Sequence, residues 1–171
     1  MFTLRCALAT LTATLACATF TAQAADVFTA TLDGSQQLPE PVKTNATGKL
    51  ELKPSADGKS IEYTLSVSNL ANAVAGDLHL GPASANGPLV LKLFPRPGAS
   101  TKTGEFSGVL AQGTITAADL IGPLLGSSLA DFIDELKAGD VYTNVHTSDG
   151  RDPPNSGPGD YRLGEIRGQL K

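Results

Sequence analysis

The sequence predicts a mainly β fold, an antiparallel sandwich or barrel with one or two short helices before the penultimate strand. Three features support this prediction. Apolar and polar residues alternate in many short segments, as in strands whose successive side chains point to opposite faces. Turns rich in Gly and Pro separate these segments. Residues 116–138 change to the spacing of apolar residues that is typical of helices.

The first half of the chain contains several alternating segments, at residues 27–32, 48–53, 61–67 and 76–82. Asp57 and Gly58 lie between the second and third segments and predict a β-hairpin, because Asp-Gly suits the tight turns that join antiparallel strands. Residues 36–45 contain Pro39 and Pro41 and are expected to form an extended loop.

Two further strands are expected at residues 89–94 and 104–110. Thr116 suits the N-cap of a short helical turn through Leu120, and Pro123 interrupts the pattern. Ser127 or Ser128 can cap a second helix, which closes at residues 138–139. The apolar residues of this helix fall at helical spacing: Leu129, Phe132, Ile133 and Leu136. We expect this stripe to pack against one edge or end of the strands.

The last two predicted strands, residues 139–147 and 164–170, each have one apolar and one polar face. The polar faces carry Tyr142, Asn144, His146, Glu165, Arg167 and Gln169. These side chains indicate either a functional constellation on a β scaffold or an ordinary sheet with one solvated face, which is the commoner case. The loop between the strands, residues 148–163, is long, and such loops are either functional or disordered.

Residues 1–25 resemble a secretory signal peptide, with Arg5 near the start, an apolar middle and small residues before residue 26. We therefore expect an exported domain of residues 26–171, periplasmic or extracellular, without a transmembrane span. Both cysteines, Cys6 and Cys17, lie in the leader, so the mature chain has no disulfide. A lipid anchor on Cys17 is a minor alternative, because residues 14–17 weakly resemble a bacterial lipoprotein box.

The charge of the mature chain argues against nucleic acid as a partner. Without Arg5, 12 basic residues face 17 acidic residues, which gives a net charge of −5. Neutralising phosphates requires clustered Lys and Arg, and the sequence has no basic run.

The two histidines, His79 and His146, define a candidate metal site. Asp77 shares a predicted strand face with His79, and imidazole and carboxylate groups at this spacing can bind copper or zinc together. Glu165 is a candidate fourth ligand, and Tyr142, Asn144 and Arg167 would surround the site. The alternative is a pair of ordinary hydrogen-bonding histidines. Glu165 and Arg167 share a face and are also candidates for an ion pair, whereas Arg167 could instead hold a carboxylate of a ligand or of Asp77.

Catalytic motifs are weak. The mature chain has no cysteine, and none of its serines lies in a nucleophile-elbow pattern. The Gly-containing residues 164–168 lack the Lys-Ser/Thr ending of a phosphate loop. An enzymatic activity is therefore the least favoured interpretation.

Several motifs together resemble the CHRD domain, first described in chordin and widespread in secreted bacterial proteins. The most specific are Tyr142-x-Asn144-Val145-His146-Thr147 and Gly164-Glu165-Ile166-Arg167-Gly168-Gln169-Leu170. Others lie at residues 28–34, 39–42, 46–48, 77–83 and 86–90, so the resemblance covers essentially the whole mature chain. It implies a β-sandwich, of the immunoglobulin-like or superoxide-dismutase-like Greek-key type.

Two departures from the family pattern bear on function. The family usually has His-x-His before Gly-Pro-Ala, and Asp77 replaces the first of these histidines. The loop at residues 148–163 also looks longer than usual. The His-x-His and Val-His strands are similar to the copper-ligand strands of copper–zinc superoxide dismutases, which points to His79 and His146, whereas a carboxylate at Asp77 weakens a preference for copper.

Two functions follow from the sequence. The first is an exported binding or interaction module with an unidentified protein partner, because chordin binds extracellular growth factors. The second is a metal-binding protein that uses Asp77, His79 and His146 to hold copper or zinc. A redox or hydrolytic enzyme ranks third.

Overall fold

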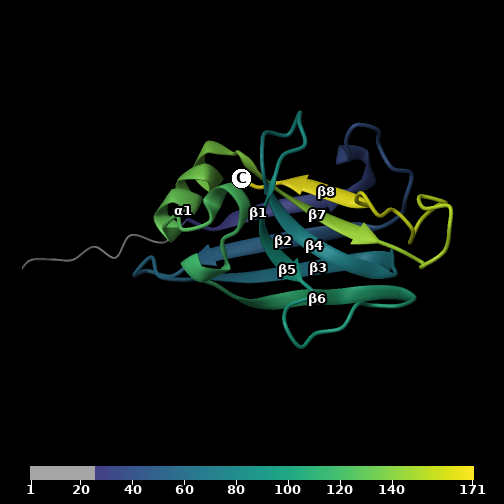
Figure 1. The fold of residues 1–171 in the computed structure, drawn as a ribbon, viewed down its shortest axis with the longest axis horizontal. Helices are drawn as coiled ribbons and strands as arrows, with labels where there is room; N and C mark the ends of the chain where they lie inside the picture. Colours follow the sequence, from purple (N-terminus) through teal and green to yellow (C-terminus); the bar gives the residue numbers. More distant parts are fainter. Residues whose placement is uncertain (1–25) are drawn as a thin grey trace, which may run out of the picture.

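A single antiparallel sheet forms the body of the protein, for which the computed structural model describes residues 26–171. Its eight strands are β1 (Phe28–Asp33), β2 (Thr47–Pro54), β3 (Ile61–Ala71), β4 (Ala73–Leu80), β5 (Leu89–Phe94), β6 (Glu105–Ile115), β7 (Val141–Thr147) and β8 (Ile166–Gln169). They lie in the order β5-β4-β7-β8-β1-β2-β3-β6 (Figure 1). The predicted signal peptide, with Cys6 and Cys17, lies outside the described residues and stays a prediction.

The sheet curls until its edge strands β5 and β6 come into contact, so it forms a nearly closed barrel. The predicted mainly β, antiparallel fold is confirmed. The separate sheets of an immunoglobulin-like or superoxide-dismutase-like sandwich are not confirmed, because hydrogen bonds join all the strands in one order. Alternating residues cannot separate these architectures, since both bury one face of every strand.

The hairpin of β2 and β3 illustrates how the sequence sets local structure. Gly58 adopts a left-handed φ of 67° in the turn, and Pro54 then pairs with Ile61. Strand β3 runs to Ala71, further than its alternation predicts, because a register shift between Val67 and Leu70 interrupts the alternation without ending the strand.

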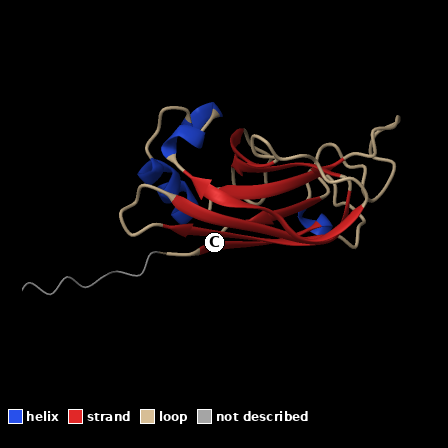
Figure 2. Cartoon of the chain, turned by 90° about the horizontal axis from the view of Figure 1, so that it is seen from below, coloured by secondary structure: helices blue, strands red, loops and turns tan. Residues whose placement is uncertain are grey.

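The helices between β6 and β7 cover one end of the barrel (Figures 1 and 2). The short helices η2 (Ala117–Asp119) and η3 (Gly122–Leu124) precede α1 (Leu129–Ala138), and η1 (Gly34–Gln36) follows β1. Ser128 and Asp131 form a capping box at the start of α1, and Gly139 ends it in the left-handed conformation, as predicted. Leu129, Phe132 and Leu136 are buried in the core, and Ile133 packs against it. No helix within residues 26–171 is long and apolar enough to cross a membrane.

Strand β8 lies between β7 and β1 and joins the two parts of the sheet. The backbone of Lys171, just after β8, exchanges hydrogen bonds of 2.9 and 3.1 Å with Thr29 of β1. Gly168 permits this contact, since a Cβ atom there would lie 2.4 Å from the carbonyl oxygen of Thr31. The Gly in this strand therefore has a packing reason.

The polar faces of β7 and β8 are buried, so the expectation of a solvated face is wrong. Tyr142, Asn144 and Arg167 are at most 6% exposed, and Glu165 is fully buried. Side chains from these strands bond to three loops that cross the face, at residues 37–44, 82–87 and 159–163. The periodicity of a strand does not indicate whether a loop from a distant part of the sequence will cover one of its faces.

Candidate metal centre

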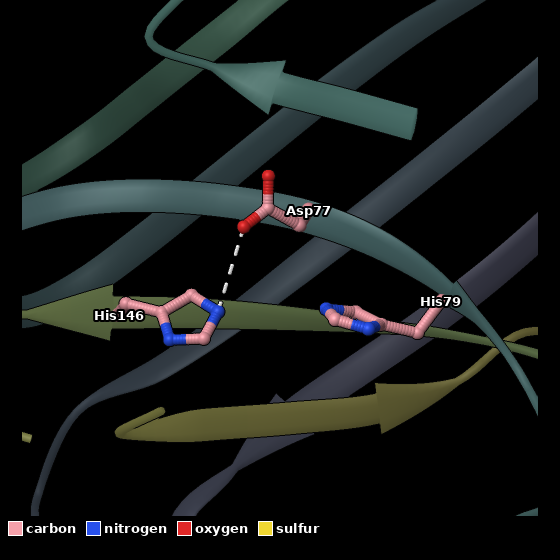
Figure 3. A group of neighbouring side chains, drawn as sticks. All are labelled: Asp77, His79 and His146. Atoms are coloured by element: carbon pink, nitrogen blue, oxygen red, sulfur yellow. Dashed lines mark ion pairs between the residues drawn. The ribbon is translucent and has the colours of Figure 1, made fainter. Parts of the chain in front are cut away.

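Neighbouring strands bring Asp77, His79 and His146 together. Asp77 and His79 project from the same face of β4, and the register with β7 pairs Ala75 with His146. His146 is therefore the diagonal neighbour of Asp77 on that face. One ligand atom from each residue lies within 4.8 Å of the other two. Figure 3 shows the three side chains pointing toward one another.

Backbone carbonyls orient both imidazoles. Nδ1 of His79 lies 3.0 Å from the carbonyl oxygen of Gly87, and Nδ1 of His146 lies 3.0 Å from that of Arg162. A carbonyl oxygen can only accept, so these contacts place a proton on Nδ1, and in the neutral ring this leaves a lone pair on Nε2. Nε2 of His79 is buried and has no hydrogen-bond partner among the described residues. Histidines that bind metals in proteins usually have their other ring nitrogen held by a hydrogen-bond acceptor in this way.

Asp77 supplies the negative charge of the site. Its Oδ2 lies 3.5 Å from Nε2 of His146, and both side chains are less than one-fifth exposed. Burial raises the pKa of Asp77, although positive charge on His146 and Lys92 opposes the shift. Burial lowers the pKa of His79; the hydrogen bond with the Gly87 carbonyl opposes this shift, and positive charge on His146 and Arg167 adds to it. Low solvation therefore disfavours the charged forms of both side chains.

An aromatic ring packs against His79, and a cation packs against that ring. The Tyr142 ring stacks on the His79 ring, with centroids 5.0 Å apart and planes inclined by 9°. The guanidinium of Arg167 lies 3.7 Å from the Tyr142 centroid on β7. Of the predicted neighbours of the site, Tyr142 therefore contacts His79 itself, and Arg167 contacts Tyr142.

Glu165 belongs to a different polar cluster. Its Oε1 accepts a hydrogen bond of 2.6 Å from the Thr44 hydroxyl. Its Oε2 accepts from the Thr147 hydroxyl at 2.7 Å and from the backbone N–H of Gly159 at 2.8 Å. The structure does not bring Glu165 into the metal group, and Arg167 bonds elsewhere, so the predicted fourth ligand and Glu165–Arg167 pair are not found in the described residues.

Asn144 ties two loops to β7. Its Oδ1 accepts a hydrogen bond of 2.6 Å from Gln37, and its Nδ2 donates to the carbonyl oxygen of Leu163 at 3.2 Å. Gln37 lies 107 positions away in sequence, so no local pattern indicated its role. The roles of the Gly87 and Arg162 carbonyls could not be predicted from the sequence either, because every residue carries a backbone carbonyl.

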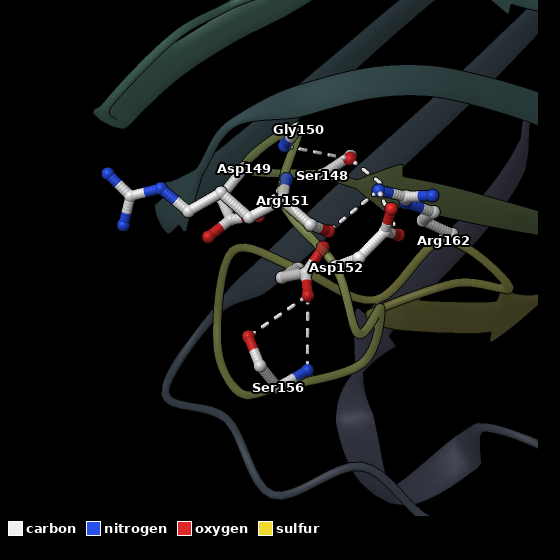
Figure 4. Close-up of polar contacts among 8 residues, drawn as sticks. Ser148, Asp149, Gly150, Arg151, Asp152, Ser156 and Arg162 are labelled. Atoms are coloured by element: carbon white, nitrogen blue, oxygen red, sulfur yellow. Dashed lines mark hydrogen bonds and ion pairs between the residues drawn. The ribbon is translucent and has the colours of Figure 1, made fainter.

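The long loop at residues 148–163 is held by its own polar contacts (Figure 4). Arg162 donates to the Ser148 hydroxyl at 3.2 Å and to the carbonyl oxygen of Arg151 at 2.9 Å. Asp160 accepts hydrogen bonds from the backbone and hydroxyl of Ser156. These contacts connect distant parts of the loop, and the backbone carbonyl of Arg162 orients the His146 ring.

The family model of the CHRD domain matches residues 28–153. The chain belongs to the CHRD domain family. The matched part of the CHRD domain contains Asp77, His79 and His146, and it ends inside the long loop, before β8. The resemblance predicted from the sequence motifs is therefore confirmed. No curated protein gives a significant match.

Proposed function

We propose that this CHRD domain is an exported metal-binding protein that holds copper or zinc through Asp77, His79 and His146. One observation carries the proposal: Nε2 of each histidine faces the Asp77 carboxylate while each Nδ1 is engaged by a backbone carbonyl. One donor atom from each of the three residues thus lies within 4.8 Å of the other two. Such a cluster of donor atoms suits a cation better than a neutral group.

The ligand chemistry favours Cu²⁺ or Zn²⁺. Imidazole nitrogen binds both ions well, whereas Mg²⁺ and Ca²⁺ prefer sites built from oxygen alone. Residues 26–171 contain neither Cys nor Met, so no thiolate or thioether is present to select Cu⁺. Asp77 makes the site harder than an all-histidine site and brings zinc into competition with copper. With only three protein ligands, the ion would keep a position for water or another small ligand.

Export remains part of the proposal. The signal-peptide pattern in residues 1–25 supports it, with residues 26–171 as the exported domain in the periplasm or outside the cell. Lipidation at Cys17 would anchor the same domain to a membrane surface. Mass spectrometry of the protein from its native host separates these outcomes, since a cleaved, unlipidated chain begins near residue 26.

The decisive test is calorimetric titration of residues 26–171 with Cu²⁺ and with Zn²⁺. We expect one ion per chain. His79→Gln and His146→Gln should each weaken binding by more than the about 10- to 100-fold that loss of an outer-sphere partner costs. Glu62→Gln, a change on the exposed side of β3, is the matched control and should bind normally. Equal metal uptake by the double histidine variant would refute the proposal.

An interaction module is the second candidate function. Three loops converge over the polar faces of β7 and β8, and loops held by a rigid scaffold often carry binding surfaces. Membership of the CHRD family supports the same role. A protein partner whose binding does not depend on the metal would bind the His79→Gln and His146→Gln variants with the affinity of the parent. The identical variants therefore discriminate the two functions.

A further inference from the structure

Arg167 is a buried cation without a carboxylate partner among the described residues. It is 2% exposed, and its guanidinium donates only to oxygens of the segment at residues 82–86. The bonds reach Ala85 O at 2.8 Å, Asn86 Oδ1 at 3.0 Å and Pro82 O at 3.2 Å. Burying an unpaired charge is costly, so a fold that keeps one needs these acceptors. Arg167 thereby fastens this segment over the end of β4.

Gly87 follows this segment directly and contacts His79 of the candidate metal site. The Gly87 carbonyl accepts the Nδ1 proton of His79, and its N–H donates to the Tyr142 hydroxyl at 3.0 Å. A Cβ atom on Gly87 would lie 1.7 Å from the carbonyl oxygen of Leu80. Only Gly therefore allows this carbonyl to approach His79 along the course that the segment takes.

A second route connects Arg167 with His79. The guanidinium lies against one face of the Tyr142 ring, and His79 stacks on that ring at 5.0 Å. The Tyr142 ring is thus fixed by a cation–π contact and by Gly87 together. Arg167 thus contacts both the segment that leads to the Gly87 carbonyl and the ring that stacks on His79.

We propose that Arg167 is a positioning residue for the metal site: it holds residues 82–87 and the Tyr142 ring so that His79 presents Nε2 to the ion. This inference rests on the proposed function, because it names what prepares that site. It also concerns the metal-free protein, where the tautomer of His79 can be measured by itself. The two proposals can therefore fail separately.

The test compares Arg167→Lys with Arg96→Lys. Arg96 is a matched control, because it also lies over a tyrosine ring, at 5.9 Å from Tyr63, and also donates to a backbone carbonyl, that of Thr114 at 2.8 Å. Lys keeps the positive charge but lacks the planar fork that reaches several acceptors. We expect the Arg96 variant to keep the parent site.

The first readout is the ¹⁵N NMR spectrum of the His79 ring in metal-free protein. The parent and Arg96→Lys should show one tautomer protonated at Nδ1, and Arg167→Lys should show a mixture. The second readout is Cu²⁺ affinity, which should fall about 10- to 100-fold in Arg167→Lys alone. The electron paramagnetic resonance spectrum of bound Cu²⁺ should change with it.

A folded Arg167→Lys variant with the parent tautomer and parent Cu²⁺ affinity would overturn the inference. Should that variant fail to fold, Asn86→Ala removes one exposed acceptor of Arg167 and should shift both readouts less, in the same direction. An unchanged tautomer in Asn86→Ala would then overturn it. If the parent binds no metal although Arg167→Lys alters the tautomer, the metal function fails and the hold of Arg167 on His79 stands.

Discussion

Nε2 of His146 lies 3.5 Å from Oδ2 of Asp77, and each atom belongs to a side chain that is largely buried. When the His146 ring is neutral with its proton on Nδ1, these two atoms present lone pairs to each other, whereas a protonated ring forms an ion pair with the carboxylate. Such an arrangement costs stability in the absence of a proton or a cation. Groups retained at a cost to stability commonly serve function.

Asp77→Asn should stabilise the metal-free protein and weaken metal binding. An amide N–H can donate to Nε2 of His146 and removes a buried charge, so the free energy of unfolding should rise by about 1 kcal/mol. The neutral amide is a poorer ligand, so Zn²⁺ affinity should fall at least about 10-fold. Urea denaturation in a chelator and calorimetry measure the two effects. A loss of stability would show that Asp77 is a structural residue.

Metal binding should raise thermal stability. An ion that binds only the folded state at 100 times its dissociation constant adds about 2.7 kcal/mol to the free energy of unfolding. Differential scanning calorimetry should therefore show a higher melting temperature with Cu²⁺ or Zn²⁺, reversed by a chelator. The His79→Gln/His146→Gln variant is the control and should melt at one temperature with or without metal.

Acid should destabilise the metal-free protein partly through His79. Its pKa in the folded state is below the ordinary 6.5, so below pH 6.5 the unfolded chain binds a proton that the folded chain excludes. The contribution to stability is present above pH 6.5 and is lost as the pH falls toward the lowered pKa. Asp77 acts in the opposite direction, because its pKa is raised in the folded chain. Its protonation stabilises the folded chain at low pH, and this contribution is lost as the pH rises through the raised pKa.

The measurement is urea denaturation between pH ~7.5 and ~5, in a chelator, for the parent and for His79→Gln. The parent should lose more stability than the variant over this range. Parallel pH profiles would mean that His79 keeps an ordinary pKa in the folded protein.

Gly164→Ala should be far more harmful than Gly126→Ala. Both residues have left-handed φ angles, 125° and 83°, so each substitution carries backbone strain of about 1–2 kcal/mol. A Cβ atom on Gly126 meets nothing within 4 Å, whereas one on Gly164 would lie 2.4 Å from the Asn144 amide. Chemical denaturation should show an additional loss in Gly164→Ala. Equal losses would mean that Asn144 can move aside freely.

Glu165→Gln should loosen the long loop. A Gln side chain has one acceptor oxygen and would turn an amide N–H toward a donor, either Thr44 or the Thr147 and Gly159 pair. Leaving buried donors unmatched costs about 1–3 kcal/mol. Hydrogen exchange should rise in residues 148–163, and the exposed Glu62→Gln change should leave it unaltered. Unchanged exchange in Glu165→Gln would contradict a role for this carboxylate in holding the loop.

Local patterns in the sequence predicted most of the fold. Local patterns located each of the eight strands, although β3 and β6 run beyond their predicted ends at residues 67 and 110, and the Ser128 cap with Gly139 bounded α1 correctly. The choice between sandwich and barrel depends on which strands pair, and pairing of β5 with β4 or contact of β5 with β6 leaves no local signal. Strand periodicity also gave the shared face of Asp77 and His79.

The supporting structure of the site could not be predicted in the same way. Arg167 and Glu165 seemed able to pair because they alternate on one strand, yet each bonds to a loop more than 80 or 100 positions away, at Ala85 and Thr44. Their burial results from loops that cross the strands, and a loop path is not encoded in the spacing of residues. Backbone carbonyls that orient the histidines carry no residue signature at all.

The position of β8 has a consequence for the order of folding. This last strand lies between the group β5-β4-β7 and the group β1-β2-β3-β6, so the hydrogen-bonded sheet is not continuous until it docks. Such long-range pairing is slow, because loop closure must precede the contacts that reward it. Asp77, His79 and His146 all lie in the first group and can meet early, whereas Arg167 arrives with β8. An ion captured during refolding would therefore enter a site whose His79 is still free to turn, before the guanidinium locks it.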